Sequence, residues 1–339
     1  MSNNSTKILF IITLISGILI TISSNSWLNA WMGLEINLLS FIPLMTSQEN
    51  IYTTEASLKY FLIQALASTI LLFAIMSKTM IENMFSMSPS SLLTLLATPL
   101  FLKSGVAPFH WWFPSVMEGL SWLNCLILLT IQKISPLILI SYLIKTSAFM
   151  TMIILSSVII GALGGFNQTS IRKILTYSSI NHMGWLILAM LLGENFWLTY
   201  FTFYTLLTMS IISIISPFQV SFINQTFSIN NNNQVIKYFI FSSFLSLGGL
   251  PPFLGFIPKW VIIQTMANNY SFWMITIMVL ASLITLYYYL RIAYSAFLIL
   301  NMEPAWNLLN YKTPLNSNVQ LSIMSNLGML ILTSIMLFF

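Results

Sequence analysis

Four ionisable side chains lie deep inside long apolar stretches of this sequence, where charged groups are rare. Glu35 and Lys133 each lie in the middle of a stretch, Lys103 follows the apolar run 92–102, and Lys259 follows a proline-rich interruption. A charged side chain inside a membrane-spanning segment is costly and commonly marks a path for ions or protons. The three lysines lie too far from the ends of their stretches to reach an interface easily. We therefore expect these four residues to handle protons, with a purely structural pairing of Glu35 left as an alternative.

Two histidines and a serine are secondary candidates. His110 lies in the interrupted segment that begins at Lys103, and His182 lies in the polar stretch 178–184 together with Ser179. A histidine in a membrane span either bonds one helix to another or carries protons, and the sequence leaves both roles open. We keep His110, His182 and Ser179 as possible members of a proton relay.

The composition excludes most soluble functions. Apolar residues make up 57% of the 339 residues and charged residues only 6%, whereas a soluble domain carries about 25% charged residues. This composition predicts a polytopic membrane protein rather than a soluble enzyme or a nucleic-acid binder. With a single cysteine, two histidines and no dinucleotide-binding glycine motif, we expect no disulfide, metal, iron–sulfur cluster or other redox cofactor in this chain.

Apolar runs bounded by polar or Pro/Gly clusters predict an all-α membrane protein with about eleven transmembrane helices. Their approximate limits are 7–23, 26–45, 56–77, 92–119, 122–143, 149–167, 173–193, 195–217, 236–266, 271–295 and 320–339. Two long spans are interrupted at 103–114 and 246–258, where prolines remove hydrogen-bond donors and clash with the preceding turn. We expect each to split into two half-helices joined by irregular backbone, which survives at membrane depth only inside protein or beside water.

The two interruptions share the pattern Pro-Phe-x4-Pro at an offset of 144 residues, and the earlier spans shifted by this offset fall on later ones. The same shift takes Glu35 to Ser179, so the second half offers a hydroxyl where the first offers a carboxylate. Five spans per repeat force opposite orientations, as in the inverted repeats of secondary transporters. We expect a first five-helix repeat at 1–145, a second at 146–300, and a loop with the last transmembrane helix at 301–339.

Loop charges predict the orientation of the chain in the membrane. Positively charged residues are enriched in loops on the inside face. With the N-terminus inside, six Lys or Arg residues fall in inside loops and two in outside loops: Lys7, Arg172, Lys173, Lys237, Arg291 and Lys312 against Lys78 and Lys145. We therefore expect the N-terminus inside and the C-terminus outside.

Six motifs carry a family resemblance. They are Trp31-Met-Gly-Leu-Glu-Ile-Asn37, Glu55-Ala-Ser-Leu-Lys-Tyr-Phe61, the whole of 103–114, Gln168-Thr-Ser-Ile-Arg-Lys173, Ser178-Ser-Ile-Asn-His-Met-Gly-Trp185, and 248–260. Together they resemble the antiporter-like, Mrp-related membrane-arm subunits of mitochondrial NADH:ubiquinone oxidoreductase (respiratory complex I), with the pattern of the subunit 2 family in insects. The resemblance runs from about residue 25 to 295. Bacterial members of this family carry three further N-terminal spans that this sequence lacks.

The resemblance implies a core proton-translocating subunit of the mitochondrial inner membrane, with its N-terminus in the matrix and its C-terminus in the intermembrane space. It implies that Glu35 and Lys103 form a carboxylate–lysine pair, that Lys133 connects the two halves, and that Lys259 is the second-half lysine. Oxidation of NADH through FMN and iron–sulfur clusters, and reduction of ubiquinone, would occur in other subunits of the same enzyme. Partners would be other membrane-arm and accessory subunits and membrane lipids such as cardiolipin, with no nucleic acid.

Two alternatives remain at this point: a cation/proton antiporter subunit, and a passive spacer of the membrane arm. Burial disfavours a charged ammonium and a nearby carboxylate favours it, so opening the Glu35–Lys103 pair would change the affinity of Lys103 for its proton. Lys103 is expected to end a half-helix, where the helix dipole favours an ammonium, and Lys259 to begin one, where the dipole disfavours it. The two lysines should then differ in how readily they lose a proton.

Overall fold

The computed structural model describes residues 4–47, 50–84, 89–227, 234–268, 271–294 and residue 323. The described residues form an all-α fold without named strands, as the apolar pattern predicts. The chain divides into two compact units, Met1–Ile153 and Ile154–Phe339. The expected loop and last transmembrane helix, at 301–339, lie outside the described residues apart from residue 323. The repeat boundaries expected at 145 and 300 remain a prediction.

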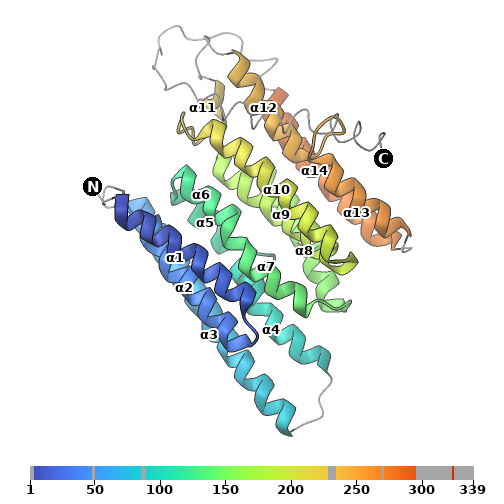
Figure 1. The fold of residues 1–339 in the computed structure, drawn as a ribbon. Helices are drawn as coiled ribbons and strands as arrows, with labels where there is room; N and C mark the ends of the chain where they lie inside the picture. Colours follow the sequence, from blue (N-terminus) through green and yellow to red (C-terminus); the bar gives the residue numbers. More distant parts are fainter. Residues whose placement is uncertain are drawn as a thin grey trace, which may run out of the picture. The chain divides into compact units, whose positions relative to one another are not determined.

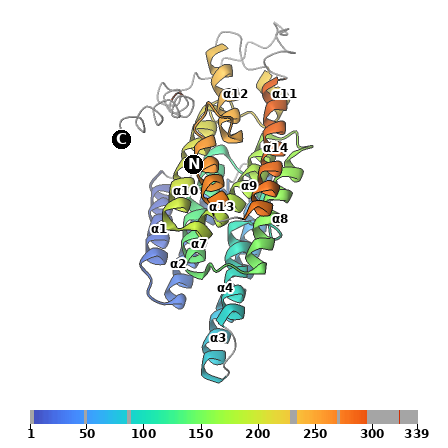
Figure 2. The same cartoon turned by 90° about the vertical axis from the view of Figure 1, so that its right-hand side faces the viewer.

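The first unit is built from seven helices that pack mostly against their sequence neighbours. They are α1 (Asn4–Ser23), α2 (Trp27–Met45), α3 (Ile51–Met84), α4 (Pro89–Ser104), α5 (Trp112–Gly119), α6 (Trp122–Leu129) and α7 (Ile131–Leu143). Helices α1, α2 and α3 lie side by side, and α4 and α5 both contact α3 (Figure 1). In both views α3 extends past the ends of α1 and α2, because it is 34 residues long (Figure 2). The sequence predicted a shorter span here, 56–77.

The described part of the second unit contains most of α8 (Ala148–Gly165), followed by α9 (Ile171–Leu192), α10 (Glu194–Ile215), α11 (Ile223–Phe227), α12 (Gln234–Gly248), α13 (Phe256–Asn268) and α14 (Phe272–Tyr294). Among the candidate membrane spans of the described residues, α9 is the most enclosed, with 89% of its most apolar stretch buried. It packs against α10 and α13, while α12 packs against α10 and α14. The polar residues of α9 are therefore held inside protein.

Eight helical stretches in the described residues are long and apolar enough to cross a membrane, and one of them, Trp122–Leu143, consists of α6 and α7 together. Two shorter apolar helices, Leu93–Ser104 and Tyr238–Gly248, belong to the interrupted segments. A membrane-spanning helix needs about 20 residues. The two helices that flank each break, α4 with α5 and α12 with α13, together have enough residues to cross the membrane. The expected membrane fold is thus confirmed, whereas the eleventh span, at 320–339, falls outside the described residues apart from residue 323.

Both predicted breaks are present, and the first follows a standard helix-ending geometry. Helix α4 ends at Ser104, and Gly105 follows with φ of 72°. The N–H of Gly105 bonds to the carbonyl of Leu102 (3.3 Å), and the N–H of Val106 bonds to that of Phe101 (3.1 Å). This is a Schellman motif, in which glycine adopts the left-handed conformation that other residues avoid.

The second break repeats this geometry 144 residues later. Gly249 has φ of 86°, and its N–H bonds to the carbonyl of Ser246 (3.1 Å). The N–H of Leu250 bonds to the carbonyl of Leu245 (3.5 Å). Each break then forms a further turn, in which the N–H of a phenylalanine bonds to the carbonyl three residues earlier. Phe109 bonds to Val106 in the first break, and Phe253 bonds to Leu250 in the second. The Pro-Phe pattern in the sequence therefore reports a repeated backbone structure.

The repeat extends to the contact between the helices that begin each half. A Cβ added to Gly17 of α1 would lie 2.9 Å from the backbone nitrogen of Asn37 on α2. A Cβ added to Gly161 of α8 would lie 2.6 Å from the backbone nitrogen of Asn181 on α9. Both pairs are 144 residues apart in sequence. The same glycine–asparagine contact thus brings two helix backbones close together in each unit.

One interruption was not predicted from the sequence. The expected continuous span 122–143 is divided at Thr130 into α6 and α7. The Thr130 hydroxyl donates to the carbonyl of Leu126 (2.7 Å), the same carbonyl that accepts the Thr130 N–H (3.0 Å). Side-chain bonds of this kind bend helices, and Pro136 removes a donor two turns later.

Candidate functional site

A small polar cavity inside the first unit brings together two of the predicted lysines. Its volume is about 20 Å³, and its lining includes Lys103, Lys133, Asn37, Gln132 and Gln64. The lysines come from different elements, the end of α4 and the start of α7. The breaks at both places turn the backbone so that two residues 30 positions apart in the sequence face one cavity.

Lys103 lies in the last turn of α4 and is buried, with 9% of its surface exposed. Two side chains satisfy the carbonyls at this helix end. The Gln64 amide donates to the carbonyl of Lys103 (3.2 Å), and the Trp112 indole donates to that of Leu102 (3.2 Å). The Lys103 ammonium has no hydrogen-bond acceptor among the described residues. The Lys103 ammonium therefore lies near the C-terminal end of α4, which the helix dipole makes favourable for a positive charge, but it donates no hydrogen bond to a described backbone carbonyl.

Glu35 lies half-buried on α2, and its negative charge attracts the Lys103 ammonium. Within the described part of the chain, no direct ion pair joins the two groups. The structure shows an electrostatic attraction of Glu35 for Lys103 without direct contact, and the functional carboxylate–lysine pair stays a prediction. Such an interaction responds to small movements of either helix because its strength falls with distance.

Lys133 is almost fully enclosed, with 2% of its surface exposed. Its Nζ lies 5.2 Å from the centre of the Phe113 ring, within the range of a cation–π interaction. Pro136 lies in the same helix, one turn beyond Lys133. The aromatic face favours the charged form of Lys133 without accepting its proton, while burial disfavours that form.

Lys259 belongs to the first turn of α13, as predicted, and is 6% exposed. Its ammonium, however, reaches back across the break and donates to the carbonyl of Gly248 at the end of α12 (2.9 Å). The expectation that Lys103 and Lys259 have opposite dipole environments is therefore wrong for the charged atoms. The long side chain carries the ammonium from the start of one half-helix to the carbonyl end of the other.

His182 belongs to a buried cluster of aromatic side chains in the second unit. Its Nδ1 lies 2.9 Å from the Tyr200 hydroxyl, and its ring lies 5.2 Å from that of Tyr204. Ser179, one turn earlier, is buried and donates to the carbonyl of Thr176 (2.8 Å). The predicted relay candidates His182 and Ser179 lie on α9, and His182 contacts two tyrosines of α10 that the sequence did not single out.

His110 lies in the first break and is not among the residues that line the cavity. Its Nδ1 lies 3.3 Å from the carbonyl of Pro108, and its ring stacks on that of Trp111 at 5.2 Å. The side chain of Trp111 is 82% exposed. His110 itself is 5% exposed, so it is a buried side chain next to an exposed aromatic ring.

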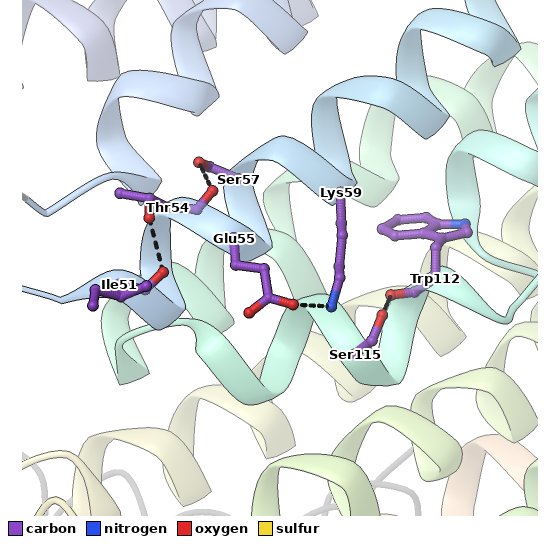
Figure 3. A network of polar contacts seen from close by, with 7 residues as sticks. All are labelled: Ile51, Thr54, Glu55, Ser57, Lys59, Trp112 and Ser115. Atoms are coloured by element: carbon purple, nitrogen blue, oxygen red, sulfur yellow. Dashed lines mark hydrogen bonds and ion pairs between the residues drawn. The ribbon is translucent and has the colours of Figure 1, made fainter.

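Lys59, near the start of α3, differs from the three buried lysines because it is exposed. Lys59 forms an ion pair with Glu55 at 2.6 Å, and both side chains are about half exposed (Figure 3). Trp112 and Ser115 of α5 lie beside this pair (Figure 3). An exposed ion pair one helical turn apart contributes about 0.5 kcal/mol or less. Lys59 is therefore a suitable comparison for the buried lysines.

Known proteins match both the sequence and the fold. Residues 24–285 match the family described as NADH:quinone oxidoreductase/Mrp antiporter, TM. The chain is 53% identical to NADH-ubiquinone oxidoreductase chain 2 of Aedes aegypti, over 99% of this chain and 98% of that protein. The corresponding protein of Locusta migratoria is 43% identical, over 99% of both chains.

Solved structures share the fold at lower identity. A chain of respiratory complex I from Thermus thermophilus has a TM-score of 0.83 at 23% identity, covering 98% of this chain and 78% of that chain. A chain of the Mrp complex from Dietzia has a TM-score of 0.78 at 15% identity, covering 96% of this chain and 75% of that chain. The motifs around Glu35 and the two breaks fall within the matched family region. The chain therefore belongs to the NADH:quinone oxidoreductase/Mrp antiporter membrane family.

Proposed function

We propose that this chain is a core membrane-arm subunit of respiratory complex I and that it translocates protons across the mitochondrial inner membrane. The observation that carries the proposal is the shared cavity of Lys103 and Lys133, beside the charge of Glu35. Two ammonium groups in a low-dielectric place repel each other, so the charge of one lysine influences the protonation of the other. Loss of the proton from Lys103 would remove this repulsion and so favour the charged form of Lys133.

In this mechanism Glu35 controls Lys103, Lys133 passes protons toward the second half, and Lys259 acts there. The gap between Glu35 and Lys103 matters because closing it would stabilise the charged lysine, and opening it would release the proton. His182 and Ser179 are candidates for the second-half relay, and His110 is a candidate for a relay at the first break.

We further propose that the chain has no redox site. Oxidation of NADH through FMN and iron–sulfur clusters, and reduction of ubiquinone, would take place in other subunits of the complex. The chain would act as part of the enzyme by moving protons, in contact with other membrane-arm and accessory subunits and with lipids such as cardiolipin. Its N-terminus would face the matrix and its C-terminus the intermembrane space.

The proposal is tested by the ratio of protons pumped to electrons transferred in a complex that carries Lys103→Met. We expect this variant to pump fewer protons per electron, because methionine fills the space without a titratable group. The matched control is Lys59→Met, which removes an exposed lysine of the same unit and should leave the ratio unchanged. A normal ratio in Lys103→Met would favour a structural spacer, and cation transport by the purified chain alone would favour an antiporter.

A further inference from the structure

Two side-chain amides that line the first-unit cavity each keep one polar atom without a hydrogen bond. Asn37 is 2% exposed; its Nδ2 donates to the Ser135 hydroxyl (3.3 Å), while its Oδ1 has no partner among the described residues. Gln132 accepts a bond from the Tyr60 hydroxyl (3.5 Å), while its buried Nε2 has no partner there. A buried polar atom without a partner costs about 1–3 kcal/mol, so two at one cavity require an explanation.

The position of Asn37 is a repeated feature of the fold. Asn181, 144 residues later, is 1% exposed and also has an Oδ1 without a partner among the described residues. Both asparagines lie where a glycine of the neighbouring helix allows close backbone contact. An unsatisfied acceptor that occurs at the same position of both units is a built feature rather than a local accident.

The cavity has the size and lining for a single water molecule. About 10–15 Å³ of accessible space accommodates one water, and this cavity has about 20 Å³. A water needs two to four polar partners, and the amides of Asn37 and Gln132 supply two. Because water can donate twice and accept twice, it satisfies these groups in either orientation of the two amides.

We propose that Asn37 and Gln132 hold one water between Lys103 and Lys133, and that Asn37 is a positioning residue for proton transfer between the two lysines. The Lys103 ammonium, which has no acceptor among the described residues, would donate to this water. Proton transfer then balances without any co-reactant: Lys103 gives its proton to the water, and the water gives one to a neutral Lys133. This inference rests on the proposed function and adds the residues that hold the transferring group.

The chemistry of the cavity favours water over a metal cation or an anion. The two ammonium groups that line it repel a metal cation. An anion such as chloride would be attracted by the lysines and could accept from the Gln132 amide, but it cannot donate to the Oδ1 of Asn37 and would leave that atom without a partner. Water is the occupant that both the lysines and the amides accept.

A map of the assembled complex at a resolution that shows buried waters tests the site directly. We expect one peak within hydrogen-bonding distance of the Asn37 and Gln132 amides. The absence of a peak there, in a map that shows other buried waters, would overturn the proposal. A peak that is replaced by bromide when chloride is exchanged would identify an anion and would overturn it as well.

The role of Asn37 is tested by Asn37→Leu, which has a similar size but no polar group. We expect the coupled rate to fall about five- to tenfold, the factor that corresponds to the loss of one ordinary hydrogen bond or slightly more. Asn37→Ser leaves a hydroxyl and room for water, and should preserve most of the rate. The control Asn124→Leu removes a comparable amide bond, to the carbonyl of Leu44 (2.8 Å), away from the cavity.

The outcomes separate this inference from the proposed function. A normal rate in Asn37→Leu together with defective pumping in Lys103→Met would overturn the water site alone. Normal pumping in Lys103→Met would overturn the proposed function. If Asn37→Leu does not assemble, Asn37→Ser and the water peak decide, because a serine variant that loses pumping while keeping the water peak contradicts the role of Asn37 as a holder of water.

Discussion

Replacing Gln64 by leucine should loosen the first break. Gln64 is 4% exposed, and its amide is the side-chain donor to the carbonyl of Lys103 at 3.2 Å. Leucine fills a similar volume but leaves this carbonyl without its side-chain donor inside the protein. Losing one partner of a buried hydrogen bond costs about 1–3 kcal/mol. We expect this cost to appear at the end of α4, which Gln64 holds in place.

Hydrogen exchange of the peptide that covers 100–115, in the assembled complex, measures this loosening. The amides of Gly105 and Val106 bond within the break and exchange only when it opens. A cost of 1–3 kcal/mol corresponds to about 5- to 150-fold faster exchange, since 1.4 kcal/mol is a factor of ten. We expect this acceleration in Gln64→Leu and no acceleration in Asn124→Leu, which loses an amide bond elsewhere in the unit. Unchanged exchange in Gln64→Leu would refute the idea that this side chain holds the break.

Three further predictions follow from other contacts. Lys259→Met should accelerate hydrogen exchange at the end of α12, because it removes the donor to the carbonyl of Gly248. The control Lys59→Met, which removes an exposed lysine, should not accelerate it. Equal exchange rates in the two variants would contradict the bridging role of Lys259. Gly161→Ala should lower the thermal stability of the complex by about 1–3 kcal/mol, because the added Cβ would lie 2.6 Å from the backbone nitrogen of Asn181. A variant as stable as the wild type would contradict this close contact. Protease accessibility should place the N-terminus in the matrix and the C-terminus in the intermembrane space, and finding both ends on one side would contradict the predicted span count.

The sequence predicts the helices and the two breaks because both depend on local chemistry. Long apolar runs dictate the spans, and the Pro- and Gly-rich stretches at 103–114 and 246–258 cannot continue a helix. The break at Thr130 was missed because it arises from a threonine hydroxyl bonding to its own helix, which leaves no mark in an apolar pattern. Helix α3 was predicted too short because its ends are polar enough to resemble loops.

The candidate site was only partly predictable. Buried charges such as Lys103 and Lys133 stand out in an apolar sequence, but their shared cavity depends on how the breaks turn the chain. Gln64 was missed because the group it bonds is 39 residues away, and a single uncharged glutamine within the apolar span 56–77 does not indicate its partner. The reach of Lys259 back to Gly248 was missed because side-chain direction across a break depends on the folded backbone. Such long-range contacts cannot be derived from residue spacing alone.

The most direct test of proton transfer through Lys133 is the ratio of protons pumped to electrons transferred in a complex that carries Lys133→Arg. Arginine keeps the positive charge beside Phe113, but its guanidinium does not release a proton at physiological pH. If Lys133 passes protons, this variant should assemble and transfer electrons but pump fewer protons per electron. A normal ratio would contradict the relay and would assign Lys133 the role of a fixed structural charge.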